Sequence, residues 1–80
     1  QEIKKQGFRM YPTVKRDAQG KITRLIQERL NFVGFNLKID GIFGINTEKA
    51  VKKFQNNRNL KVDGIVGKKT WSYLIKGIKV

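Results

Sequence analysis

The feature that most constrains the fold is an internal repeat. The stretch LKIDGIFG, which begins at Leu37, recurs 23 residues later as LKVDGIVG, beginning at Leu60. The match continues to Thr47 in the first copy and Thr70 in the second. Two copies with the same apolar pattern and the same Asp-Gly pair are hard to obtain by chance. We therefore expect two equivalent units, each made of a short extended piece, a turn and a helix.

Each copy carries the chemistry of a tight turn. An aspartate can accept hydrogen bonds from backbone N–H groups just ahead of it, and a glycine adopts a positive φ without steric cost. The second glycine of each copy lies where the chain enters a helix, so it can act as a cap. Six residues are predicted to be structural on these grounds: Asp40, Gly41, Gly44, Asp63, Gly64 and Gly67.

Helical spacing of apolar residues predicts three helices, near residues 21–32, 47–57 and 68–76. The first carries an apolar stripe that includes Ile26 and Leu30, and Gly34 is expected to cap its C-terminus. We assign three large aromatic residues to the core: Phe43, Phe54 and Trp71.

A chain of 80 residues with 39% hydrophobic content can build one small core. The predicted fold class is all-α, a compact three-helix bundle with a duplicated turn-helix unit. Residues 1–6 are interpreted as a linker remnant, and residues 7–80 as the domain. Within the domain, 7–16 are expected to form an ordered arm over Leu25 and Phe32 of the first helix, and 17–80 the three-helix core.

The residue types argue against chemistry within this chain. It contains no His and no Cys, so the usual general base, the thiol nucleophile and the commonest zinc ligands are missing. Each Asp-Gly turn offers one carboxylate, whereas a calcium loop needs several. Glu28 and Glu48 are interpreted as ordinary helix residues and not as a glycosidase pair. We expect no catalytic residue, no metal site and no cofactor.

The formal net charge of +12 indicates a surface that attracts polyanions. It leaves a nucleic-acid-binding domain as an alternative, because three helices could imitate a helix-turn-helix protein. That motif needs a short turn between helices, whereas extended Asp-Gly pieces separate them here. No apolar run reaches membrane-spanning length.

A known family shares this arrangement of motifs. The residues that carry the likeness are Gly20, Ile26-Gln27, Leu30-Asn31, Val33-Gly34-Phe35, Asp40 to Gly44, Thr47, Ala50-Val51, Phe54-Gln55, Leu60, Val62 to Gly67 and Thr70-Trp71. With these, the chain resembles the type 1 peptidoglycan-binding domain of bacterial and phage cell-wall hydrolases over about residues 12–76.

The resemblance implies a non-catalytic module that binds peptidoglycan and targets an attached amidase, muramidase or endolysin-type enzyme. It also implies an extracellular place of action, at the cell wall. We expect a monomer whose partners are peptidoglycan, the attached catalytic domain and, through the basic surface, anionic teichoic acid.

The predicted ligand-binding set is Arg24, Gln27, Asn31 and Tyr73. The first three lie within about 60° of one another on the first helix, away from its apolar stripe, and Tyr73 lies outside the stripe of the third helix. Side-chain amides, a guanidinium and an exposed aromatic ring suit the amides, carboxylates and sugars of a bacterial wall. The alternative left open is that these are ordinary solvated helix residues.

Overall fold

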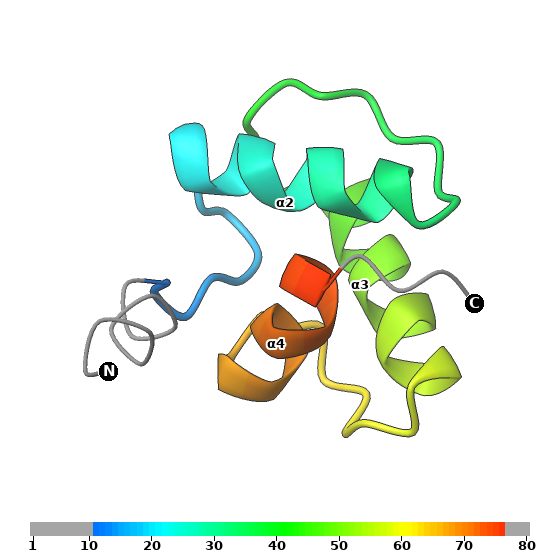
Figure 1. Ribbon diagram of the computed structural model, residues 1–80. Helices are drawn as coiled ribbons and strands as arrows, with labels where there is room; N and C mark the ends of the chain where they lie inside the picture. Colours follow the sequence, from blue (N-terminus) through cyan, green and yellow to red (C-terminus); the bar gives the residue numbers. More distant parts are fainter. Residues whose placement is uncertain (1–10, 77–80) are drawn as a thin grey trace, which may run out of the picture.

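The computed structural model describes residues 11–76. These residues form three α-helices: α2 (Lys21–Phe32), α3 (Ile45–Asn57) and α4 (Lys68–Lys76). In Figure 1, α2 crosses above α3 and α4, and a long connection leads from the end of α2 to the start of α3. The predicted all-α fold is confirmed. Helix α3 begins two residues earlier than predicted, because the carbonyl of Gly44 already accepts the first helical hydrogen bond, from the Glu48 N–H at 3.0 Å.

The core lies where the three helices meet. Its fully buried members include Ile26 and Leu30 from α2, Val51 from α3 and Leu74 from α4. The three aromatic residues assigned to the core are also buried: Phe43, Phe54 and Trp71. Burial of each large apolar side chain contributes about 1.5–3 kcal/mol, so this cluster is the main stabilising element.

The C-terminus of α2 closes as the sequence predicts. Gly34 has a φ of 120°, and the Phe35 N–H donates to the Leu30 carbonyl at 3.1 Å. This wrapping bond satisfies a helix-end carbonyl that has no partner within the helix. The chain leaves α2 here and enters the long connection.

The arm that precedes α2 is described from Tyr11 onward and lies on α4. The Tyr11 ring stacks on Trp71 at 4.5 Å between centroids, and the Trp71 indole N–H donates to the Pro12 carbonyl at 2.7 Å. Phe32 remains 52% exposed. The described part of the arm packs on α4 because the Trp71 indole offers both a stacking face and a donor. The expected cover of Leu25 and Phe32 by the arm stays a prediction. Residues 1–10, with the predicted linker, lie outside the described residues.

Two isolated antiparallel bridges tie the segment before α2 to the two repeated turns. Val14 pairs with Val66 in the second copy, and Gln19 pairs with Ile42 in the first. The two copies of the repeat thus pair with the same segment, each at a different residue of it. None of the helices in residues 11–76 has the length and apolar content needed to cross a membrane.

Candidate functional site

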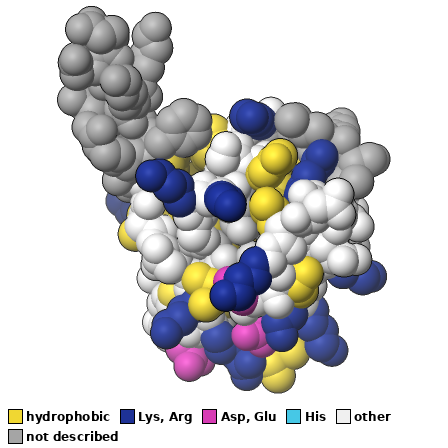
Figure 2. Space-filling view, turned by 90° about the horizontal axis from the view of Figure 1, so that it is seen from below, with side chains coloured by type: hydrophobic (Ala, Val, Ile, Leu, Met, Phe, Trp, Pro, Cys, Tyr) yellow, Lys and Arg dark blue, Asp and Glu magenta, His cyan; other side chains and the backbone are white. Residues whose placement is uncertain are grey.

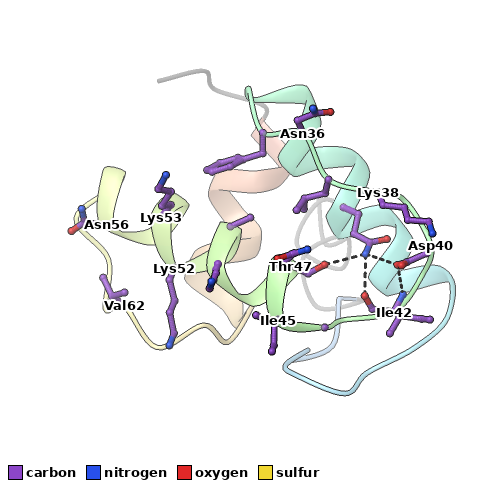
Figure 3. A pocket seen from close by; sticks show the side chains of 17 residues that line it. Asn36, Lys38, Asp40, Ile42, Ile45, Thr47, Lys52, Lys53, Asn56 and Val62 are labelled. Atoms are coloured by element: carbon purple, nitrogen blue, oxygen red, sulfur yellow. Dashed lines mark hydrogen bonds between the residues drawn. The ribbon is translucent and has the colours of Figure 1, made fainter.

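The first repeated turn is held by a buried glutamine of α2. The Gln27 side chain is 1% exposed. Its amide nitrogen donates to the Asp40 carboxylate at 3.0 Å, to the Ile42 carbonyl at 3.1 Å and to the Thr47 hydroxyl at 3.1 Å. Its amide oxygen accepts the Gly41 N–H at 2.9 Å. One side chain therefore joins α2, the turn and the start of α3 (Figure 3).

A glutamine of α3 holds the second turn in the same way. Gln55 is also 1% exposed, and its amide nitrogen donates to Asp63 at 3.0 Å, to the Ile65 carbonyl at 2.9 Å and to Thr70 at 3.1 Å. Its amide oxygen accepts the N–H groups of Asp63 and Gly64, at 3.1 and 2.9 Å. We call each of these sets, the glutamine with its Asp-Gly turn and threonine, a glutamine brace.

The two Asp-Gly turns have the same geometry in both copies. Gly41 and Gly64 have φ values of 76° and 74°, and in each copy the aspartate accepts the N–H two residues ahead at 2.9 Å. Gly44 and Gly67 precede α3 and α4, and their carbonyls accept the N–H four residues later at 3.0 and 2.9 Å. All six predicted turn residues therefore have structural roles.

The hydrogen bonds of the braces also lower the pKa values of the two turn aspartates. The bond from the Gln27 amide, followed by that from the Ile42 N–H, lowers the pKa of Asp40 from its ordinary value. The backbone N–H two residues ahead is the main cause that lowers the pKa of Asp63, and partial burial opposes it. Both carboxylates are thus held in the ionised, acceptor form that the turns require.

The two copies differ in the length of chain between the glutamine and the aspartate. Gln27 and Asp40 are 13 residues apart, whereas Gln55 and Asp63 are 8 apart. Three of the five additional residues extend α2 beyond its glutamine, and two lengthen the connection that follows the helix. Asn31 fixes this connection from α2, because its amide donates to the Leu37 carbonyl at 2.9 Å and accepts the Leu37 N–H at 2.7 Å. The extra residues are therefore held in a defined path.

A groove lies between this longer connection and α3, with a volume of about 990 Å³. The sides of the groove carry mainly three kinds of side chain. They are the lysines Lys38, Lys49, Lys52 and Lys53, the asparagines Asn36, Asn46 and Asn56, and the exposed aliphatic residues Ile42, Ile45 and Val62. Gln27 and Thr47 also line the groove and are buried, so they form its floor. The brace of the first copy thus supports the surface of the groove from below.

Lysine and arginine side chains are spread over the surface and do not form one block. Figure 2 shows them distributed across one whole face, with few acidic side chains between them. The ion pair between Arg16 and Glu48, at 3.1 Å, uses one of these acids. The basic surface is therefore a general feature, and in the groove it meets exposed apolar side chains.

The four residues predicted to bind a ligand do not share one surface. Arg24 is exposed beside a shallow hollow at the start of α2, and Asn31 is occupied with the Leu37 backbone. Tyr73 is half-buried, with Arg58 and Lys76 over its ring at 5.8 and 5.5 Å.

The expectation that Gln27 lies on the exposed side of its helix is wrong. Its partners come from a turn that starts 13 residues further along the chain, and helical projection from the apolar stripe cannot detect them. That any of the four residues contacts a wall ligand stays a prediction.

The sequence analysis also gave the second glutamine no structural role and did not predict the groove. A signal for the glutamine was present, because an apolar-Gln pair precedes each copy of the repeat, as Ile26-Gln27 and as Phe54-Gln55. The pairs are 28 residues apart and the turns 23 apart, so an ungapped comparison does not align them. The groove had no comparable signal, since its lining comes from the path of a connection without regular structure.

Comparison with known families matches the chain to the putative peptidoglycan binding domain over residues 19–74. Among curated proteins, it is similar to the spore cortex-lytic enzymes of Bacillus cereus (40% identity) and Bacillus subtilis (45% identity). The matches cover 82% and 78% of this chain, and 26% and 21% of the two enzymes. The chain thus spans about a quarter of the length of these relatives.

Solved structures agree. The chain is similar to the SleB N-terminal domain, with a TM-score of 0.79 and 39% identity over 82% of this chain and 92% of that one. It is also similar to the Burkholderia AP3 phage endolysin, with a TM-score of 0.80 and 38% identity over 86% of this chain and 27% of that one. These likenesses support the predicted wall-binding module and not the nucleic-acid alternative. The chain belongs to the family of peptidoglycan-binding domains.

Proposed function

We propose that this chain binds bacterial peptidoglycan in the groove between α3 and the longer connection, and so holds an attached cell-wall hydrolase on its substrate. The observation that carries the proposal is that the groove lies where the two copies of the repeat differ. The second copy shows what the fold needs, which is a brace and a short connection. The connection of the first copy has two residues more than that brace needs. It contributes Phe35, Asn36, Leu37 and Lys38 to the wall of the groove.

The lining of the groove suits the chemistry of peptidoglycan. A stem peptide and an N-acetylated sugar offer amides, carboxylates and methyl groups. The asparagines can donate to and accept from amides, and the lysines can donate to carboxylates. The half-exposed Ile42, Ile45 and Val62 can cover methyl groups. A concave site of this volume lies within the range that ligand pockets occupy, roughly 300–1,000 Å³.

We propose that catalysis resides in another part of the protein. The chain has neither His nor Cys, and its relatives are roughly three to four times as long. The proposed place of action is outside the cell, at the wall, with the module as a monomer. Its charge of +12 should add attraction to teichoic acid, which salt would screen over about 8 Å at physiological strength.

Co-sedimentation with purified sacculi tests the groove. We would compare the wild type with Lys38→Gln/Lys53→Gln, which removes two groove lysines, and with Lys61→Gln/Lys76→Gln, which removes the equivalent pair of the second copy. The net charge changes equally in both variants, and neither Lys61 nor Lys76 lines the groove. We expect the groove variant to lose most of its retention at physiological salt and the control to keep it. Equal losses would mean that retention depends on overall charge and would refute the proposed site.

A further inference from the structure

We infer that the groove selects peptidoglycan whose stem peptides carry free carboxylates, over peptidoglycan in which those carboxylates are amidated. This inference rests on the proposed function and narrows its ligand. It draws on three observations: where the lysines lie, what the acidic group of the groove is already bound to, and which side chains lie between the lysines.

Three of the four groove lysines lie toward its two ends. Figure 3 shows Lys38 near the turn, on the side of Ile42, and Lys52 and Lys53 at the opposite end, on the side of Val62. Two separated groups of ammonium donors suit a ligand that carries carboxylates at intervals along a chain. They suit a single compact anion less well, because that would contact one group and leave the other without a counter-charge.

The acidic side chain in the lining does not offset these lysines fully. Asp40 accepts the Gln27 amide at 3.0 Å and the Ile42 N–H at 2.9 Å through the same carboxylate oxygen, Oδ1. These bonds fix it within the turn. With four lysines and one acid in the lining, the groove carries a net positive charge at neutral pH.

The exposed aliphatic side chains of the groove favour a peptide ligand over other polyanions. Ile45, Ile42 and Val62 are 53%, 51% and 48% exposed, and all three line the groove. Covering them releases about 25 cal/mol per Å² of apolar surface, but only a ligand with methyl or methylene groups beside its charges can do so. Alanine residues and the alkyl chain of a diamino acid provide such groups, whereas a phosphodiester backbone provides few.

Amidation of the ligand would weaken the contact between its carboxylates and the groove lysines. An ammonium group has donors and no acceptor, so a carboxylate is its natural partner. A carboxamide keeps one acceptor oxygen but brings an NH₂ donor and loses the charge. Hydrogen bonds to charged groups contribute more than neutral ones, so we expect a loss of affinity of roughly ten-fold or more on amidation.

Titration calorimetry with two synthetic ligands tests the inference. The probes are N-acetyl-L-alanyl-γ-D-glutamyl-meso-diaminopimelate and the same peptide with every carboxylate amidated. We expect the free acid to bind at least roughly ten-fold more tightly to the wild type. The preference should collapse in Lys38→Gln/Lys53→Gln and persist in Lys61→Gln/Lys76→Gln. Circular dichroism of each variant would establish that the fold is intact.

Other outcomes would overturn the inference, and each of them shows whether the proposed function fails with it. Equal affinity for acid and amide, with both weakened by the groove variant, would keep the site and reject the selectivity. Binding of neither peptide, with retention on sacculi unchanged, would reject the carboxylate ligand while wall binding stands. Competition by poly(glycerol phosphate) as strong as that by the free acid would show a phosphodiester site instead. Loss of sacculus binding altogether would instead remove the proposed function.

Discussion

The two copies of the repeat share a brace and differ in the connection that the brace closes. Gln27 and Gln55 make the same bonds to an aspartate, a carbonyl and a threonine. The first pair of glutamine and aspartate spans 13 residues, and the second spans 8. The longer connection is fixed by Asn31 and borders the groove. The brace that both copies share therefore holds the fold, and the longer connection of the first copy adds Phe35 and Asn36 to the groove in which we place binding.

The largest expected effect comes from breaking either brace. In Gln27→Leu or Gln55→Leu, the buried threonine and the turn N–H groups lose their partner, so each variant should lose about 2–4 kcal/mol of unfolding free energy. Chemical denaturation would measure this, with the exposed neighbour Glu28→Gln as the control. A loss below about 1 kcal/mol for one copy would mean that the two braces are not equivalent.

The same variants should differ in binding. At a temperature where both remain folded, Gln27→Leu should weaken retention on sacculi, because this brace supports the groove floor. Gln55→Leu should retain its binding, since none of the residues that accept a hydrogen bond from Gln55 or donate one to it lines the groove. Equal binding by both folded variants would separate the first brace from the site.

The turn glycines come next in size. An alanine at Gly41 or Gly64 would have to adopt a positive φ, which costs about 1–2 kcal/mol. At Gly64 the added carbon would also lie 3.1 Å from side-chain carbons of Glu48 and Lys52, which can move. Both variants should therefore lose similar stability. Gly44→Ala is the matched control, because its φ is −99° and nothing lies within 4 Å of the new carbon; if it destabilises equally, φ is not the cause.

Asn31→Ala sharpens the comparison further, because it removes a contact within the longer connection. We expect a loss of about 1 kcal/mol and faster amide hydrogen exchange at residues 35–39, since Leu37 loses both bonds to the side chain. Exchange in the second connection, at residues 58–62, should not change. Faster exchange in both connections would indicate general loosening of the fold.

The smallest expected effect is a loss of stability as the pH becomes acidic. Both aspartates of the braces have a pKa lowered by folding, so their contribution is complete above the ordinary aspartate pKa, about 4. It is lost as the pH falls below that value toward the lowered pKa of the folded state. Thermal melts between pH 7 and pH 2 would show this. The slope should be reduced in Asp40→Asn/Asp63→Asn, and an unchanged slope would exclude these two groups as its cause.

The sequence predicts the regular parts of this fold well and the site less well. Helical spacing places all three helices, and the Asp-Gly pairs identify both turns, because these signals are local. The role of Gln27 depends on Asp40 and Thr47, which only the folded chain brings to it. Projection of a single helix therefore places a buried polar side chain on the solvent side. The groove depends on the path of residues 33–39, which carry no periodic pattern.

The central claim is that the longer connection makes the first copy the binding copy. Titration of ¹⁵N-labelled protein with a soluble disaccharide-peptide tests it most directly. We predict chemical-shift changes at Lys38, Ile42, Val62 and the face of α3 that carries Lys53, with the second turn, residues 63–67, and Tyr73 unaffected. Shifts confined to Arg24, Tyr73 or the second turn, with the groove unmoved, would contradict the claim.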